Sequence, residues 1–308
     1  MTGKGKMTFL QEPERLQAAA YALRHDRMRG AMELALQAVA FAVELRERDP
    51  DLAVRVIAHV LAGARPSMAA IANAVALTLV PFAHDPDVGN VRQHAERRIA
   101  AWRADNQRLI DAAGPHIPKD ILTYSHASTT RTTLLALQNH LHRVVIPEGR
   151  PVDDGKRLAA ILAAAGIPVT VVTEAQMGWW VPRVEAIIVG ADTVTPAGDV
   201  VNHMGTATLA RIACEHGVPM YSLTHTLKIA PYDRPEDLRE ENDPAEIWAD
   251  PPVGITIRNP AFDRTPAAQI TIITERGLLT DDLRASIVAE HRAAWQALGL
   301  DRGDAVSS

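Results

Sequence analysis

The residues best suited to chemistry in this sequence follow short apolar segments. Asp192 comes shortly after the β-branched run of residues 184–189, and Asn202 and His203 stand immediately before a helical segment that begins near Met204. A carboxyl group held at such a position can donate a proton to a substrate oxygen as a general acid. The ordinary alternative is that Asp192 only closes a turn at the strand end or caps a helix.

A second candidate is the hydroxyl-rich stretch of residues 125–130, between a short apolar segment and a helical one. Ser125, Ser128 and Thr129 offer hydroxyl groups there, and the start of a helix offers free N–H groups, so the stretch suits an anion. It lacks the glycines of a Walker loop and the G-x-S-x-G elbow, which argues against a nucleoside triphosphate site and a serine hydrolase. Capping of the helix is the simpler role for these hydroxyls.

Two arginines stand at the starts of predicted helices in the first part of the chain. Arg29 precedes a helix that begins near Met32, and Arg65 precedes one in which Pro66 occupies a first-turn position. An arginine beside a helix N-terminus is a competent site for phosphate or carboxylate, because the free N–H groups and the helix dipole add to its charge. Alternatively, both are ordinary solvated arginines.

The elements that must position these residues are of two kinds. Up to about residue 112, apolar residues recur at helical spacing, and no alternating strand pattern of useful length appears. Residues 112–120 contain one glycine and two prolines and predict a domain boundary. We therefore expect a helical N-terminal domain over residues 1–116 and an α/β domain over residues 117–308.

Short β-branched runs alternate with helical segments in this second part, which predicts a doubly wound parallel sheet. The predicted strands lie at residues 121–124, 144–146, 169–172, 184–189, 220–223, 255–257 and 270–273. Right-handed crossovers bring the carboxyl ends of parallel strands to one edge, where ligands bind in such folds. Ser125, Asp192 and Lys228 all follow predicted strands, so they are expected at that edge.

The composition narrows the class of protein. The chain has 308 residues, is 47% hydrophobic and carries a formal net charge of −5, which argues against a general nucleic-acid binder. It has no apolar run long enough for a membrane span and no signal peptide, so a soluble, cytoplasmic protein is expected. The single cysteine, Cys214, excludes an intramolecular disulfide and is expected to be a buried thiol in a helix. No motif signals a cofactor or a metal ion.

The order of several short motifs resembles one family. They are Arg29-Gly30-Ala31, Ala64-Arg65-Pro66-Ser67, Ile121-Leu122-Thr123, Glu148-Gly149-Arg150-Pro151 with Gly155, Gly190-Ala191-Asp192, Asn202, Gly205-Thr206, Gly217-Val218-Pro219, Lys228, Asn259-Pro260-Ala261-Phe262-Asp263 with Thr265-Pro266, and Ile273-Thr274-Glu275-Arg276-Gly277. The family contains methylthioribose-1-phosphate isomerase, ribose-1,5-bisphosphate isomerase and the alpha, beta and delta regulatory subunits of translation initiation factor 2B. The resemblance covers nearly the whole chain. It implies a helical domain on a Rossmann-like domain, assembled as a homodimer or a larger even homo-oligomer.

The resemblance also implies roles for particular residues. Asp192 matches the general acid of the isomerases, and Ser125 stands where they carry a catalytic cysteine. The positions that match substrate-binding residues are Arg29, Gly30, Ala31, Met32, Arg65, Ala127, Ser128, Thr129, Asn202, His203 and Lys228. The implied reaction is an aldose–ketose isomerisation of a pentose 1-phosphate, such as ribose 1,5-bisphosphate or a 5-modified ribose 1-phosphate, without a cofactor or metal ion.

Three positions depart from the isomerase pattern: Ser125 replaces the cysteine, His203 replaces a lysine, and Asp154 replaces a glutamine. A serine hydroxyl is a far weaker partner for a proton than a cysteine thiolate unless another group takes its proton. An alternative function is therefore a non-catalytic protein that binds sugar phosphates or nucleotides, like the regulatory subunits. A third possibility is a related isomerase with an altered substrate.

Overall fold

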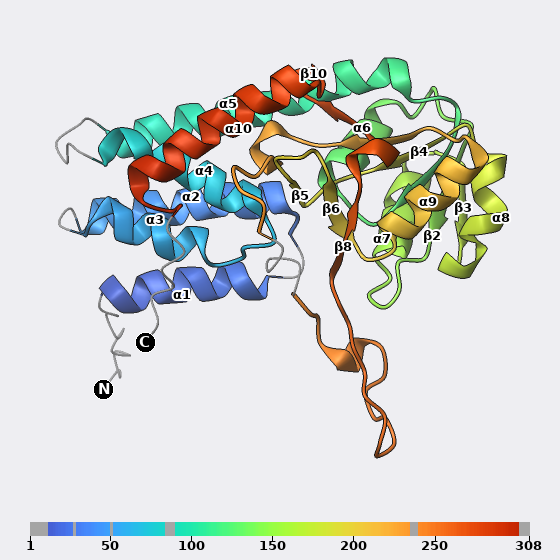
Figure 1. Cartoon of the computed structure of the whole chain (residues 1–308), viewed down its shortest axis with the longest axis horizontal. Helices are drawn as coiled ribbons and strands as arrows, with labels where there is room; N and C mark the ends of the chain where they lie inside the picture. Colours follow the sequence, from blue (N-terminus) through green and yellow to red (C-terminus); the bar gives the residue numbers. More distant parts are fainter. Residues whose placement is uncertain (1–11, 27–28, 50–51, 84–89, 235–239, 302–308) are drawn as a thin grey trace, which may run out of the picture. The chain divides into compact units, whose positions relative to one another are not determined.

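The computed structural model describes residues 12–26, 29–49, 52–83, 90–234 and 240–301 (Figure 1). The chain divides into two compact units. The first comprises Met1–Pro66, Ile71–Ile99 and Ala293–Ser308, and the second comprises Ser67–Ala70 and Ala100–Arg292. The first unit is helical and the second contains both sheets, which confirms the expected α/β fold class. No helix in the described part of the chain is long and apolar enough to cross a membrane.

The helical unit is built from amphipathic helices. They are α1 (Glu12–His25), α2 (Ala31–Arg48), α3 (Val54–Ala62) and most of α4 (Ala69–Leu79), with the first part of α5 (Val91–Ala113) and the end of α10 (Asp281–Leu298). Within α2, Leu34, Ala38 and Leu45 recur at helical spacing and are all buried. This periodicity places one face of α2 in the core of the unit, as the sequence predicts.

The second unit contains a seven-stranded sheet with the strand order β10-β9-β7-β4-β1-β2-β3. Its strands are β1 (Asp120–Tyr124), β2 (Arg143–Pro147), β3 (Val169–Val172), β4 (Ala186–Val189), β7 (Met220–Leu223), β9 (Thr271–Thr274) and β10 (Gly277–Leu278). All neighbouring strands are parallel except β10, which pairs antiparallel with β9. The helices between them are α6 (Ser128–Ala136), α7 (Asp154–Ala164), α8 (Met177–Trp180) and α9 (Thr206–His216).

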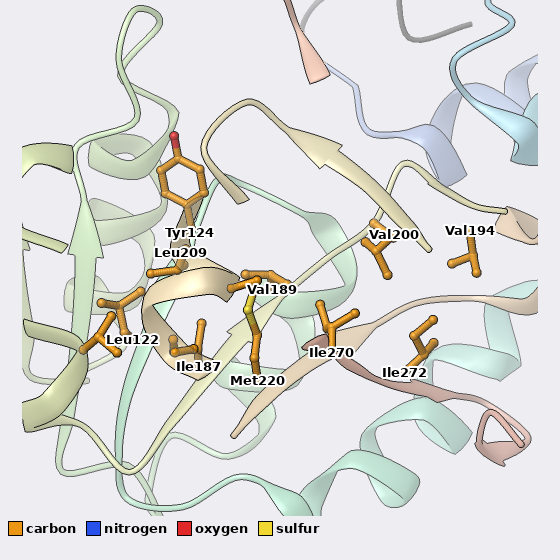
Figure 2. Close-up of a cluster of buried hydrophobic side chains, with 14 of the residues drawn as sticks. Leu122, Tyr124, Ile187, Val189, Val194, Val200, Leu209, Met220, Ile270 and Ile272 are labelled. Atoms are coloured by element: carbon orange, nitrogen blue, oxygen red, sulfur yellow. The ribbon is translucent and has the colours of Figure 1, made fainter. Parts of the chain in front are cut away.

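Helices cover both faces of this sheet. Leu122 and Tyr124 of β1 face a core that includes Leu209 of α9 and Met220 of β7 (Figure 2). Side chains from alternate positions, such as Ile121, face a second core to which α5, α6 and α7 contribute. Because successive strand residues point to opposite faces, two apolar cores require strands that are apolar throughout. Most residues of the short β-branched runs meet that requirement, and buried Thr123 of β1 is an exception.

The strand order defines a topological switch point at the centre of the sheet. From β1 the chain proceeds to β2 and then β3 on one side, whereas β4, β7 and β9 follow on the other. The crossover connections after β1 and β4 therefore diverge, and doubly wound proteins bind ligands outside the carboxyl ends of strands at such a point. Ser125 follows the end of β1, and Asp192 lies just beyond the end of β4.

A second, antiparallel sheet was not anticipated from the sequence. It has the order β5-β6-β8 and consists of β5 (Thr193–Val194), β6 (Val200–His203) and β8 (Phe262–Thr265). The predicted strand at residues 255–257 is absent, because that segment pairs with no strand in the described chain and Ile255 is exposed. The expectation for Cys214 was also wrong: the thiol lies on the exposed face of α9, which is buried through Leu209 and Ala213 instead.

Candidate functional site

Ser125 is held in an unusual conformation at the carboxyl end of β1. Its φ angle is 68°, in the left-handed region that side-chain-bearing residues rarely adopt. Its Oγ donates a 2.7 Å hydrogen bond to Asp154 Oδ2, and the His126 N–H donates to the same oxygen at 3.2 Å. The turn after β1 therefore directs the Ser125 hydroxyl toward a carboxylate rather than toward a histidine.

Ala127, Ser128 and Thr129 form the start of α6, beside the end of β4. The two elements approach closely, because a Cβ added to Gly190 would lie 2.3 Å from Ala127 Cβ. Thr129 is buried and its Oγ1 donates to the Leu223 carbonyl at the end of β7 at 2.9 Å. In the part of the chain that the structure describes, no side chain caps α6, so its first N–H groups suit an anion at the strand ends.

Lys228 anchors the segment that carries Asp192. Its side chain is buried, and its Nζ donates a 2.5 Å hydrogen bond to the Ala191 carbonyl. Burial lowers the pKa of Lys228, and the negative charge of Asp192 opposes that shift. The Asp192 N–H donates to the Val201 carbonyl at 2.9 Å, and the residue is half-buried. The carboxyl group therefore sits on a backbone segment that is fixed from two sides.

Asn202 and His203 lie at the end of β6. Asn202 is buried, and its Nδ2 donates to Thr206 Oγ1 at 3.1 Å. His203 Nδ1 lies 3.0 Å from the Met204 carbonyl, and its ring meets that of Tyr124 edge to face with centroids 5.5 Å apart. Because the carbonyl can only accept, Nδ1 carries the proton and Nε2 of a neutral His203 is left as an acceptor.

Tyr124 and Asp263 support this corner, and neither was a predicted site residue. Tyr124 is buried and its hydroxyl donates to the Met204 carbonyl at 2.8 Å, and burial raises the pKa of that hydroxyl. Asp263 Oδ2 accepts from the N–H groups of Gly205 and Ala207 at 2.7 and 3.0 Å, which satisfies the start of α9. Burial raises the pKa of Asp263, although these two hydrogen bonds oppose the shift.

The remaining predicted residues lie in the helical unit, where the two arginines among them contact Asp26. The Arg29 N–H donates to Asp26 Oδ1 at 3.0 Å, and Arg65 Nη1 donates to the Asp26 carbonyl at 2.9 Å. Arg65 is buried, whereas Arg29 is exposed. Gly30 is the N-cap of α2. Ala31 and Met32 are the first residues of that helix, and both are buried.

One group of side chains in the second unit has the geometry to hold a cation. Ligand atoms of Asp105, His225 and Glu275 lie within 4.8 Å of one another. His225 is already engaged, since its Nε2 lies 2.9 Å from Asn106 Oδ1 and its Nδ1 lies 3.6 Å from Glu275 Oε2. Although burial opposes ionisation, the bond from His225 and those from Thr226 lower the pKa of Glu275. Contacts among these side chains and Asn106 and Thr226 therefore already occupy His225 and Glu275.

The structure brings together the predicted residues of the second unit. Tyr124 joins the end of β1 to His203, Gly190 joins the end of β4 to Ala127, and Lys228 joins the loop after β7 to Ala191. The residue that sequence reasoning missed is Asp154, which appeared only as a departure from the resemblance. Its position three residues after Pro151 gave no signal of contact with Ser125, because the contact depends on the pairing of β1 with β2.

These features define an α/β protein with a doubly wound sheet, whose switch point is a candidate ligand site. A model described as the initiation factor 2 subunit family matches residues 27–281, and the chain belongs to that family. This confirms the resemblance drawn from the motifs.

Three similar proteins illustrate the range of the family. A ribose 1,5-bisphosphate isomerase of Archaeoglobus fulgidus is 29% identical over 90% of this chain and 93% of its own length. A methylthioribose-1-phosphate isomerase of Anaeromyxobacter dehalogenans is 31% identical over 93% of this chain and 88% of its own. A solved structure of translation initiation factor eIF-2B from Pyrococcus horikoshii OT3 superposes with a TM-score of 0.75, at 28% identity, over 87% of this chain and 97% of its own.

Proposed function

We propose that the protein is an aldose–ketose isomerase that acts on a pentose 1-phosphate. The observation that carries the proposal is the placement of Asp192 beyond the end of β4, at the switch point, on a segment fixed by Lys228. Two relatives that align over most of the chain are named as isomerases of this substrate class. A half-buried carboxyl group can deliver a proton with less competition from solvent.

The chemistry required by a C1 phosphate assigns the role of Asp192. The phosphate prevents simple opening of the sugar ring to a free aldehyde. Asp192 therefore donates its proton to the ring oxygen as the bond from that oxygen to C1 breaks. The hydrogen on C2 moves to C1, and the 2-hydroxyl loses its proton, so that C2 becomes the ketone carbon and the phosphate stays in place.

The phosphate groups need cationic and N–H donors. In the second unit we propose the N-terminus of α6 for this role, since free helix N–H groups bind phosphate oxygens. In the helical unit, the guanidinium groups of Arg29 and Arg65 are the proposed phosphate ligands. Asn202 and His203 are proposed to contact sugar hydroxyls. Lys228, which resemblance assigns to the substrate, is given a supporting role instead, because its ammonium group already bonds to the Ala191 carbonyl.

A second candidate is a sugar-phosphate or nucleotide sensor without turnover. Ser125 in place of the isomerase cysteine favours it, as does the similarity to a structure named as an initiation factor. It predicts binding without product. The two candidates therefore differ in one measurement, which is whether a pentose 1-phosphate is converted to its ketose.

The experiment is a thermal-shift screen with pentose phosphates and nucleoside monophosphates, followed by NMR detection of ketose product. A ligand at 100 times its dissociation constant is expected to stabilise the fold by about 2.7 kcal/mol. Asp192→Asn is expected to lower kcat by about 10²- to 10⁴-fold, the usual contribution of a general acid, with the dissociation constant little changed. Asp111→Asn, an exposed change in α5, is the matched control. Binding of pentose 1-phosphates without any ketose product would replace the isomerase with the sensor.

We also propose that the chain forms a homodimer or a larger even homo-oligomer in the cytoplasm. The support is an exposed apolar segment between α9 and β8. Ile247, Trp248, Val253 and Ile255 are between 44% and 106% exposed. A cluster of large apolar side chains on a surface marks an interaction site more often than a free face.

A further inference from the structure

The Ser125–Asp154 pair is the feature of the site that the proposed reaction leaves without a role. Asp154 is 6% exposed, yet its side chain carries a carboxylate. Oδ2 accepts hydrogen bonds from Ser125 Oγ and the His126 N–H, whereas buried Oδ1 has no hydrogen-bond partner among the described residues. A buried carboxylate with one oxygen unpaired is costly, so its retention beside a reactive hydroxyl calls for a functional account.

The local fold is shaped to admit this carboxylate. Gly149 has a φ angle of 81°, and a Cβ added there would lie 1.8 Å from Asp154 Oδ1. A Cβ on Gly155 would lie 1.9 Å from the Pro147 carbonyl at the end of β2, so α7 begins in direct contact with that strand. Asp154 is the first residue of α7, where the helix dipole stabilises a negative charge.

The contact also joins two positions that depart from the isomerase pattern. Ser125 stands in place of a cysteine and Asp154 in place of a glutamine, and the two side chains are directly hydrogen-bonded. A serine needs a second group to take its proton, whereas a cysteine thiolate does not. A carboxylate 2.7 Å from Oγ supplies that group, within the distance required for proton transfer.

We propose that Asp154 acts through Ser125 as the proton acceptor of the reaction. This inference rests on the proposed isomerase function. Ser125 Oγ takes the proton of the sugar 2-hydroxyl as its own proton passes to Asp154 Oδ2, and the hydrogen on C2 moves with its electron pair to C1. Asp192 loses one proton to the ring oxygen and Asp154 gains one, and exchange with solvent restores both groups. Ser125 contacts the substrate, and Asp154 is a positioning and relay residue.

The test compares Asp154→Asn, Ser125→Ala and the double variant with the wild-type protein, using the pentose 1-phosphate that the wild type converts. Asp154→Asn keeps an oxygen acceptor but cannot take a proton. We expect kcat to fall about 10²- to 10⁴-fold with KM within about twofold, the size expected for loss of a general base. The double variant is expected to be no worse than the poorer single variant, because the residues act as a unit. Asp154→Glu, which restores a carboxylate, is expected to recover part of kcat.

Asp153→Asn is the matched control, since its half-buried side chain pairs with Lys156 rather than with Ser125 in the described contacts and the variant keeps the volume of the residue. Unchanged kcat in Asp154→Asn, or additive losses in the double variant, would overturn the relay. A measurement on the wild type alone adds a second test, independent of how the variants fold. In D₂O the product is expected to carry no deuterium at C1, and incorporation there would show that a base removes the C2 hydrogen instead. Absence of turnover by the wild type would instead remove the proposed function itself.

Discussion

Replacement of Lys228 by methionine tests whether the buried ammonium group positions the acid or binds the substrate. Methionine keeps an unbranched side chain of similar length but cannot donate to the Ala191 carbonyl, which accepts from Nζ at 2.5 Å. A hydrogen bond from a charged donor contributes about 1.5–3 kcal/mol. If that bond holds Asp192 in place for proton transfer, its loss corresponds to a fall in kcat of about 10- to 150-fold.

The assay separates the two roles of Lys228 by its kinetic signature. An anchor of Asp192 affects kcat, whereas a ligand of the substrate phosphate mainly affects KM. We would measure both constants for Lys228→Met and Lys228→Gln, because glutamine keeps a hydrogen-bond donor without the charge. A smaller loss of kcat in Lys228→Gln than in Lys228→Met supports the anchor. A large rise in KM with kcat preserved in both variants would refute the reasoning.

Stability provides an independent check with a defined sign. Burial lowers the pKa of Lys228 in the folded protein below the value of 10.5 for an exposed lysine. Between these two values the unfolded chain binds more protons than the folded one, so the unfolding free energy of the wild type rises with pH. Lys228→Met lacks this contribution. The unfolding free energy of Lys228→Met, measured with urea, is therefore expected to fall further below that of the wild type at about pH 10 than at pH 7. A difference that shrinks as pH rises would contradict the lowered pKa of Lys228.

Two further predictions concern the buried Tyr124 and the exposed residues Trp248 and Val253. Tyr124→Phe removes the hydrogen bond to the Met204 carbonyl and is expected to cost about 1 kcal/mol in urea unfolding. Burial raises the pKa of Tyr124 in the folded protein, so the wild type loses stability as pH rises past about 10, where the unfolded tyrosine ionises. The difference in unfolding free energy between the wild type and Tyr124→Phe is therefore expected to shrink above that pH. A difference that does not change with pH would argue against the burial of the hydroxyl group. Replacement of exposed Trp248 and Val253 by glutamate is expected to lower the mass measured by light scattering, and a wild-type monomer would contradict the proposed assembly.

The sheet could be predicted because its strands carry their own signal. Two apolar cores on opposite faces require runs such as Val144–Ile146 and Ala186–Val189 to be apolar at every position. The small antiparallel sheet lacked such a signal. Phe262–Thr265 of β8 contains Asp263 and Arg264, so its sequence does not resemble a buried strand, and only its pairing with β6 makes it one.

The same distinction separates the predicted part of the site from the missed part. Asp192 and Ser125 could be proposed because each follows a recognisable strand, and parallel strands end at one edge whatever their order. Asp154 follows a loop rather than a strand, and its approach to Ser125 requires β2 beside β1 and the space left by Gly149. Strand order is a property of tertiary packing that no local pattern contains.

The pairing of two substitutions carries more information than either one alone. Ser125 by itself favours a protein without turnover, because a lone hydroxyl cannot replace a thiolate, and Asp154 by itself is an ordinary residue at the start of a helix. The two side chains are directly hydrogen-bonded, so Asp154 can accept the proton that the Ser125 hydroxyl must lose. A chain that had only lost the chemistry of its relatives would have no physical reason to keep a buried carboxylate with an unpaired oxygen beside that serine. The hydrogen bond between Ser125 and Asp154 therefore adds to the placement of Asp192 a second argument for catalysis over passive binding.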